Sequence, residues 1–377
     1  RIVRFAVEEE VRTALGVPTI SEEKRIPIGI IEMSNGSRIP IFIDGDYLLG
    51  PQGAHLNISG ITGLATKTSY LMFLIQLIYQ RMKENVGIII FNVKQDDLLH
   101  LHEAPTDITP DDEKMYEILG LSKNQFPLNN PQKGIRGIKY FLPRGRRGKP
   151  NSDHIPELHY VYAYMLSDVY KRLDLLFHGV PDPYLTMRGI IDYIMERYGN
   201  LRFRKDVEDP YTGMKVRRKG DLVKTWEDLR LFRDYPSEVV RYQRTLYRFL
   251  GLLRQFTNPE THPIFVNQRS IREVYLGEEI KNIKAGEIYV IDIAKITDER
   301  EQAFIIGDVM RSLDEMYGEE GREVPSKIII LIDELNRYAP RTGRFEEVSA
   351  VTEQIREIAR TGRSRGKILF TDEKFKS

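Results

Sequence analysis

The sequence predicts an α/β fold built on a mostly parallel sheet. From about residue 54, strand-like segments alternate with helical segments, which is the pattern of parallel α/β domains. The segments 86–93 and 327–332 are apolar almost without interruption, as expected for strands that are covered on both faces. With 377 residues, of which 41% are hydrophobic, the chain is long enough to bury a large core.

The first 50 residues follow a different pattern. Two strand-like segments, 26–31 and 39–43, flank a Ser-Asn-Gly-Ser turn and predict a β-hairpin. Pro27 and Pro40 lack a backbone donor, so we expect them at edges or at strand starts. We interpret residues 1–50 as the C-terminal part of a β-barrel domain plus a linker.

Residues 51–377 are predicted to form the sheet domain, interrupted by a mostly helical insertion at about 154–275. Within the insertion we expect helices at about 156–178 and 236–257, the second with an apolar stripe at helical spacing. The strands predicted for the sheet are 54–59, 86–93, 138–142, 287–293, 327–333 and 367–370, and the connecting helices are 67–83, 299–317 and 344–361.

The stretch 57–69 has the composition of a phosphate-binding loop. Its small residues allow backbone N–H groups to close around phosphate oxygens, and the following helix start adds partial positive charge. Lys67 is expected to reach the outer phosphates and Thr68 to ligate Mg²⁺. Thr66 and Ile61 stand where the usual pattern has glycine, so this stretch alone is equally compatible with a simple strand–helix turn. The residues expected to bind nucleotide are Gly60, Thr62, Gly63, Ala65, Thr66, Lys67, Thr68 and Ser69.

A second motif supports a nucleotide site. The apolar run 328–332 leads into Asp333 and Glu334, and two adjacent acids after a buried strand are costly unless they face a cation. In phosphate-loop enzymes the aspartate supports Mg²⁺ and the glutamate polarises the attacking water. A strand end that meets solvent is the alternative, which the upstream loop makes less favoured. We therefore predict ATP and Mg²⁺ as cofactors, Thr68 and Asp333 at the metal, and Glu334 and Lys67 in catalysis.

Three arginines lie close together near the C-terminus. Arg360, Arg363 and Arg365 fall at the end of a predicted helix and in the turn before a strand. Favourable charge at a helix C-terminus accounts for one of them. In oligomeric NTPases an arginine from the neighbouring subunit stabilises charge in the transition state, so Arg360 and Arg363 are candidate catalytic residues.

Basic residues are concentrated in the segment 133–149, which contains no acid. Its Gly-rich end is expected to be a flexible loop, and loops of this charge attract the phosphate backbone of DNA without sequence preference. A solvated surface is the alternative interpretation, here and for a second basic cluster at 202–219. The candidate DNA-binding residues are Arg144, Arg146, Arg147 and Lys149.

Composition excludes several classes of protein. The net charge is only +1, so any affinity for nucleic acid must come from local patches. The chain has no cysteine, which excludes disulfides and Cys-ligated zinc. The longest apolar run, at about 71–79, is too short for a bilayer span, and we expect a cytoplasmic protein. The seven histidines show no paired metal-ligand spacing, and His55 is the one nearest the proposed nucleotide site.

Several segments together resemble the HerA branch of the HerA/FtsK ATPases. The segments that carry the resemblance are Gly60-Ile61-Thr62-Gly63, Phe91-Asn92-Val93-Lys94, Tyr289-Val290-Ile291-Asp292-Ile293, Asp333-Glu334-Leu335-Asn336-Arg337-Tyr338-Ala339-Pro340 and Arg360-Thr361-Gly362-Arg363-Ser364-Arg365-Gly366. The resemblance spans nearly the whole chain and is weakest in the helical insertion. It implies a RecA-like P-loop NTPase core, an N-terminal β-barrel and a hexameric ring with ATP sites between subunits, with Arg363 the candidate arginine acting in trans.

The function implied by this resemblance is ATP-driven translocation on double-stranded DNA. HerA proteins act with a partner, which is a NurA-type nuclease in repair, or a sirtuin-type enzyme or nuclease in antiviral defence. Two alternatives remain open: a nucleotide-binding ring scaffold that assembles and regulates an effector enzyme without processive translocation, and a motor that acts on protein. The irregular phosphate loop favours the scaffold. The phosphate-sensing glutamine that usually follows the last strand is replaced by Thr371-Asp372-Glu373-Lys374.

Overall fold

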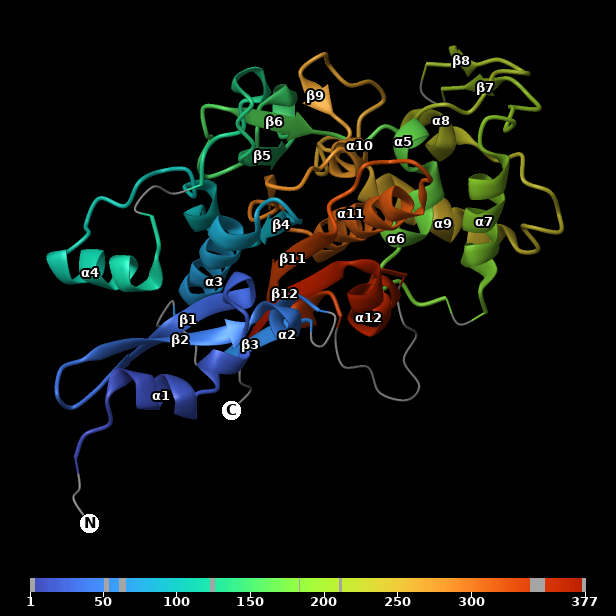
Figure 1. Cartoon of the computed structure of the whole chain (residues 1–377). Coiled ribbons are helices and arrows are strands. Elements are labelled where there is room, and N and C mark those ends of the chain that lie inside the picture. The colour runs from blue at the N-terminus through green and yellow to red at the C-terminus, as the bar shows by residue number, and fades with distance from the viewer. Residues whose placement is uncertain are drawn as a thin grey trace.

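The computed structural model describes residues 4–50, 54–60, 66–122, 126–182, 184–209, 212–339 and 350–374, with only the backbone of Gly60, Thr66, Arg363 and 372–374. Across these residues, eight strands form one sheet in the order β3-β12-β11-β4-β10-β5-β6-β9 (Figure 1). Every neighbouring pair in this sheet is parallel. In sheet order, the bounds are β3 Leu56–Gly60, β12 Lys367–Lys374, β11 Lys327–Asp333, β4 Val86–Asn92, β10 Ile288–Asp292, β5 Ile138–Pro143, β6 His159–Tyr162 and β9 Glu273–Val274.

The predicted α/β class is confirmed, and helices cover both faces of the sheet. Alternate residues of β4 point to opposite faces: Ile88 and Ile90 join a core with α3 (Thr66–Met82), whereas Ile89 and Phe91 join a larger core with α11 (Glu299–Gly318). Burial on both faces explains why the β4 segment is apolar without alternation. The other helices are α1 Glu8–Ala14, α2 Gly45–Leu49, α4 Pro110–Leu119, α5 Leu166–Val169, α6 Leu173–Leu176, α7 Thr186–Arg197, α8 Trp226–Leu231, α9 Gln243–Phe256, α10 Leu276–Lys281 and α12 Ala350–Thr361.

Short elements complete the described chain. Strands β7 Val207–Glu208 and β8 Lys215–Arg217 form a small antiparallel pair beside α7 and α8 (Figure 1). The 3₁₀ turns are η1 Val17–Thr19, η2 Glu22–Lys24, η3 Asp97–Leu99, η4 Pro131–Lys133, η5 Arg146–Gly148, η6 Tyr170–Arg172, η7 Leu335–Arg337 and η8 Gly362–Arg365. Among the described residues, no helix combines the length and apolar character that crossing a membrane requires.

The predicted N-terminal hairpin is confirmed. Strands β1 (Arg25–Glu32) and β2 (Arg38–Asp44) pair antiparallel, and because the sheet has two strands both prolines lie on edge strands. The hairpin packs on α3, where the Tyr70 hydroxyl donates to the Ile28 carbonyl at 3.0 Å. Its assignment to a β-barrel domain, like the division of the chain into domains, remains a prediction.

The prediction of one helix over 156–178 is wrong. The segment begins with β6, which extends the sheet beside β5, and continues as the short helices α5 and α6. The run His-Tyr-Val-Tyr is rich in aromatic and β-branched residues, which favour a strand when a partner strand is available. The insertion therefore contributes β6 and β9 to the sheet. The second predicted helix, 236–257, is shorter than expected and is α9, which begins at Gln243.

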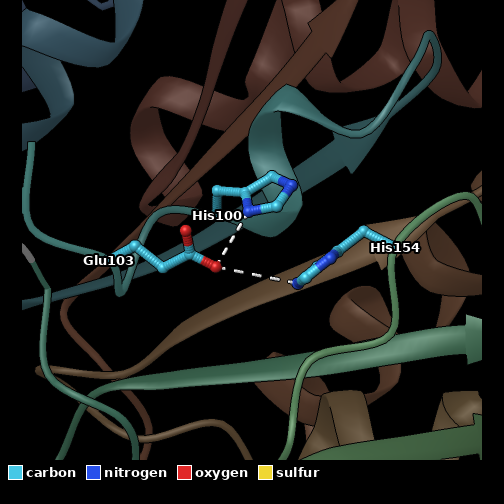
Figure 2. Close-up of side chains that lie close together, drawn as sticks. All are labelled: His100, Glu103 and His154. Carbon is cyan, nitrogen blue, oxygen red and sulfur yellow. Dashed lines mark hydrogen bonds and ion pairs between the residues drawn. The ribbon is translucent and has the colours of Figure 1, made fainter. Parts of the chain in front are cut away.

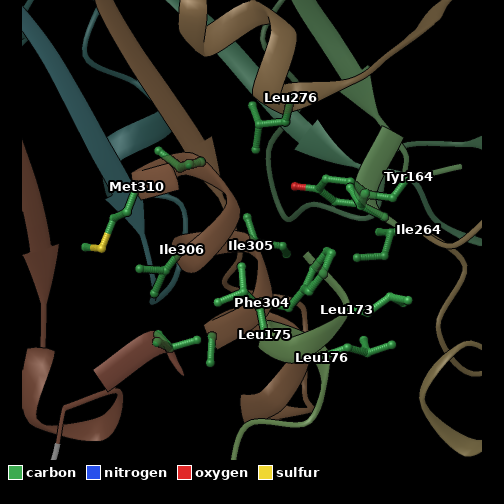
Figure 3. Close-up of a cluster of buried hydrophobic side chains, with 14 of the residues drawn as sticks. Tyr164, Leu173, Leu175, Leu176, Ile264, Leu276, Phe304, Ile305, Ile306 and Met310 are labelled. Carbon is green, nitrogen blue, oxygen red and sulfur yellow. The ribbon is translucent and has the colours of Figure 1, made fainter. Parts of the chain in front are cut away.

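The larger core has α11 at its centre. Figure 3 shows Phe304, Ile305, Ile306 and Met310 of this helix among the leucines of α6, with Tyr164 and Leu276 alongside. Tyr164 is fully buried, and its ring meets that of Phe304 edge-on at 5.2 Å. The core thus joins residues of the segment 154–275 to α11 and the central sheet.

A charged network lies inside this core. Arg172 Nε contacts Asp308 Oδ1 at 3.1 Å and Arg172 Nη1 contacts Glu315 Oε1 at 2.8 Å, while the Tyr275 hydroxyl donates to Asp308 at 2.9 Å. Burial raises the pKa of Asp308. Burial works against the charge of Arg172, but its hydrogen bond to Glu315 and its attraction to Asp308 outweigh this and raise the pKa of Arg172. The two buried charges therefore depend on each other.

Candidate nucleotide site

The predicted phosphate loop connects β3 to α3. Strand β3 ends at Gly60 and α3 begins at Thr66, so the strand and helix flanking the loop are confirmed. Thr62, Gly63 and Ala65 lie outside the described residues. Lys67, Thr68 and Ser69 occupy the first turn of α3, and a helix N-terminus provides N–H groups and partial positive charge for a phosphate.

The acidic pair lies at the carboxyl end of the strands, the same end from which β3 leads into the predicted phosphate loop. Asp333 is the last residue of β11, and it is level with Asp372 of β12, which is level with Ile58 of β3. Two strand spacings separate β11 from β3, which places Asp333 about 10 Å from the strand that leads into the loop. The strand order therefore brings the two predicted motifs together, although they are far apart in the sequence.

Glu334 is held in an unusual backbone conformation. Its φ is +51° and its residue exposure is 8%, so a buried acid occupies the left-handed region that residues other than glycine rarely adopt. Tyr338 fixes the chain beyond it: its buried hydroxyl donates to Gln302 of α11 at 2.8 Å, and its carbonyl accepts from Thr352 of α12 at 3.0 Å. These contacts hold the chain that follows Glu334 against α11 and α12.

Lys94 supplies a cation to the acidic pair. It follows β4, the strand beside β11, and its Nζ lies 2.7 Å from Glu334 Oε1 and 3.4 Å from Asp333 Oδ2. Burial disfavours the charged form of Lys94, but the bond to Glu334 and the attraction of Asp333 raise its pKa above the ordinary value. Arg337 adds a second positive group, with Nη1 3.8 Å from Glu334 Oε2. The acids are therefore balanced by the chain's own cations.

A buried polar pair lies at the same end of the neighbouring strands β4 and β10. The Asn92 amide at the end of β4 donates to the buried Asp292 carboxyl at the end of β10, over 2.8 Å. Burial raises the pKa of Asp292, and the Tyr162 hydroxyl donates to the Asp292 carbonyl at 2.8 Å. Lys94, Asn92 and Asp292 were not among the predicted site residues. Their signal was a polar residue at the carboxyl end of an apolar strand, which is where open α/β sheets bind ligands.

His55 contributes to the structure of the site. Its backbone has φ +71°, and its Nδ1 accepts a hydrogen bond from the Leu369 amide at 3.0 Å. The contact ties the start of β3 to β12. This histidine therefore helps to position the strand that leads to the predicted phosphate loop.

The predicted arginines lie at the opposite, amino end of the strands. Arg360 lies in the last turn of α12 and Arg363 lies in η8. Both precede the amino end of β12, whereas the acids lie level with its carboxyl half. The rise along β12 from Lys367 to Asp372 is about 17 Å. The Arg360 side chain is 76% exposed and pairs with Glu357 at 2.6 Å, and the side chain of Arg363 lies outside the described residues. Within one chain, the fold does not bring Arg360 or the Arg363 backbone to Glu334.

The predicted DNA-binding residues follow β5, and they differ in exposure. Arg144 is engaged internally, with Nε 2.7 Å from Glu273 and Nη1 donating to the Pro263 carbonyl at 3.0 Å. Arg146 is exposed and donates to the Glu260 carbonyl at 3.2 Å. Arg147, which has φ +60°, and Lys149 are also exposed. In the second basic cluster, Lys215 and Arg217 form ion pairs with Asp206 and Asp228.

The donor set fits magnesium. Asp333 offers a carboxylate and Thr68 a hydroxyl, and Mg²⁺ prefers such hard oxygen ligands in phosphate-binding sites. The ammonium of Lys94 at 3.4 Å from Asp333 shows that this position accepts positive charge. Thr68 and Asp333 would hold the ion, with the remaining ligands supplied by water and phosphate.

Comparison with known proteins places few constraints on the chain. No protein-family model and no curated protein matches it. Among solved structures, VirB4 of Thermoanaerobacter pseudethanolicus is 14% identical with a TM-score of 0.49, over 94% of this chain and 78% of that one. The bacterial conjugative coupling protein TrwBdeltaN70 is 13% identical with a TM-score of 0.49, over 99% of this chain and 72% of that one. The trigonal form of the same protein in complex with sulphate is 12% identical with a TM-score of 0.43, over 85% of this chain and 62% of that one.

The class of the protein follows from its own architecture. A parallel sheet has a strand–helix unit, β3 and α3, at the carboxyl end of its strands, and one strand, β12, separates β3 from the strand bearing the acidic pair. This is the α/β RecA-like fold of P-loop ATPases. The assignment to the HerA branch remains a prediction.

Proposed function

We propose that this chain is a ring-forming ATPase of HerA type that couples ATP hydrolysis to movement on double-stranded DNA. The observation that carries the proposal is the acidic pair Asp333 and Glu334, which contacts Lys94 at the carboxyl end of β11, two strands away from β3. Paired acids matched to a cation beside a phosphate loop are the parts that phosphoryl transfer to water requires. A NurA-type nuclease or a sirtuin-type or nuclease defence effector is the proposed partner.

Each site residue has a proposed role. Lys67 binds the outer phosphates from the first turn of α3, and Thr68 and Asp333 hold Mg²⁺, which neutralises phosphate charge when bound. Glu334 orients the attacking water and accepts its proton. The contact of its carboxylate with Lys94 at 2.7 Å supports this role, because a general base is most effective when it is positioned before substrate arrives.

The position of the arginines supports a ring. Arg360 and Arg363 precede the amino end of β12, away from Glu334 of the same chain, so they can act in hydrolysis only on a neighbouring copy. In a ring, the site of one subunit faces the next, and an arginine supplied in trans stabilises transition-state charge. We propose Arg363 or Arg360 for this role, and Arg146, Arg147 and Lys149 for contact with DNA phosphates.

The activity test uses the full chain with Mg²⁺ and ATP. We expect ATP hydrolysis that double-stranded DNA stimulates, and ATP-dependent displacement of a triplex strand from duplex DNA. Hydrolysis without displacement would favour the ring scaffold. The irregular loop, in which Thr66 stands where the usual pattern has glycine, also favours the scaffold. Hydrolysis insensitive to DNA, and unchanged when Arg146, Arg147 and Lys149 are neutralised, would favour a motor acting on protein. Absence of hydrolysis in the assembled particle would contradict the proposal.

Lys94→Met is expected to lower kcat for ATP hydrolysis by at least about 10-fold at neutral pH. Glu334 and Asp333 then lose the nearby cation that favours their charged forms, so the acid limb of the pH–rate profile moves to higher pH. Lys94→Arg keeps the charge and should retain the wild-type profile. Steady-state kinetics across pH for the three proteins measure the effect, and an unshifted profile in Lys94→Met would show that Lys94 does not act through the acids.

A further inference from the structure

A cluster of metal-ligating side chains lies outside the nucleotide site. His100 and Glu103 follow η3 after β4, and His154 lies in the loop between β5 and β6 (Figure 2). The three side chains converge, and one ligand atom from each lies within 4.8 Å of the others. Because only β10 separates β4 from β5 in the sheet, the loops that follow these two strands lie near each other at the carboxyl end of the strands.

The geometry centres on one carboxylate oxygen. Glu103 Oε1 lies 2.8 Å from His100 Nδ1 and 3.8 Å from His154 Nε2, and Figure 2 shows it to one side of both rings, with a dashed line to each. The ring centroids of His100 and His154 are 3.9 Å apart with an interplanar angle of 36°. A hydrogen bond from His100 accounts for the first contact, but it does not explain why the second imidazole turns its Nε2 toward the same oxygen.

The surrounding contacts are those of a supported ligand set. Asp96 Oδ2 lies 3.5 Å from the other ring nitrogen of His100, Nε2, and a carboxylate in that position commonly orients a metal-bound histidine. The loop carrying His154 is also fixed, because the Ser152 hydroxyl donates to the His154 carbonyl at 2.7 Å and the neighbouring Asp153 pairs with Lys295 at 2.6 Å. Asp96 therefore supports the His100 ring directly, and contacts of the backbone and of a neighbouring residue hold the loop that carries His154.

We propose that His100, Glu103 and His154 form a binding site for a divalent transition-metal ion, with zinc as the best-matched species. Two neutral imidazoles and one carboxylate are a zinc ligand set, and the partial exposure of all three side chains allows water to fill a fourth position. The ion would join the segment after β4, which also carries Lys94, to the loop after β5. The proposal concerns this chain's own ligands and does not depend on nucleotide binding.

The test is a calorimetric titration of Zn²⁺ into metal-free full-length chain, purified without a histidine tag and measured without nucleotide. We expect saturable binding of one ion per chain that excess Mg²⁺ does not displace, because Mg²⁺ prefers oxygen ligands. Asp96→Asn should weaken binding by about 10–100-fold, and His100→Ala or His154→Ala by more. Glu103→Gln preserves the shape of the side chain, so weaker Zn²⁺ binding by this variant would report the loss of the carboxylate and not a folding defect.

The matched control is His159→Ala. This half-buried histidine begins β6, five residues after His154 in the sequence, but its Nδ1 contacts the Pro156 carbonyl at 2.8 Å, and it is not a proposed ligand. The control should bind Zn²⁺ like the wild type, and Zn²⁺ should raise the melting temperature of both proteins but not of His154→Ala. Absence of one-to-one binding to the wild type, or equal affinity in the wild type, His100→Ala and His154→Ala, would overturn the proposal.

Discussion

Glu334→Gln is expected to lower the rate of Mg²⁺-dependent ATP hydrolysis by about 10²–10⁴-fold, the usual contribution of a positioned general base. Glutamine matches the shape of glutamate but cannot accept a proton from water. The buried position of residue 334, its backbone φ of +51° and the anchoring of Tyr338 to α11 and α12 should all be preserved. The catalytic step should therefore fail while the site remains assembled.

Binding distinguishes this result from a structural effect. The affinity for ATP should change little, because Lys67 and the α3 N-terminus, which are proposed to hold the phosphates, are untouched. Phosphate release measures hydrolysis, and equilibrium titration with a fluorescent ATP analogue measures binding. Glu299→Gln is the matched control, since that exposed glutamate also pairs with Arg337, at 3.0 Å, but lies at the start of α11. Hydrolysis at the wild-type rate in Glu334→Gln would exclude this residue as the base.

Arg172→Met is expected to reduce the free energy of unfolding by about 3–5 kcal/mol, as when one partner of a buried ion pair is removed. Asp308 is fully buried and would lose its cation while keeping only the hydrogen bond from Tyr275. Methionine fills a comparable volume, so most of the loss should come from the unpaired carboxyl group. The midpoint of urea denaturation, followed by circular dichroism, measures the change.

Two further variants separate the charge from the packing. Replacing both partners, as Arg172→Met with Asp308→Leu, should recover much of the lost stability, because no buried charge is then left unpaired. Arg188→Met removes one partner of an exposed pair with Asp192 on α7 and should cost less than about 1 kcal/mol. If Arg172→Met were as stable as Arg188→Met, the buried network would not contribute to the stability of this core.

Sequence patterns were sufficient where the signal is local. The uninterrupted apolar runs of β4 and β11 follow from burial on both faces, and the Ser-Asn-Gly-Ser turn between two strand-like segments specifies the N-terminal hairpin. The acids after β11 and the Lys-Thr pair at the start of α3 could be found from their positions relative to these elements. That both motifs belong to one site was predicted from the chemistry of phosphate-loop enzymes, which need both, and not from local pattern.

Sequence patterns failed where a distant partner decides the structure. The segment 156–178 has enough apolar residues for a helix, but its first part forms β6 because the free edge of β5 offers hydrogen bonds to a strand. The histidines showed no metal-ligand spacing because His100 and His154 lie on separate connections, which meet only when β4 and β5 take their places in the sheet. Such contacts depend on strand order, which local periodicity does not encode.

The sequence by itself determined the class of fold, the strand–loop–helix of the predicted phosphate site and the acidic pair at Asp333 and Glu334, because each depends on residues adjacent in the chain. Only the tertiary structure decided that Lys94 neutralises this pair, that Arg172 and Asp308 depend on each other, and that Arg360 lies away from the acids of its own chain. The physical reason is that charges act over distances in space, and the order of the strands sets those distances.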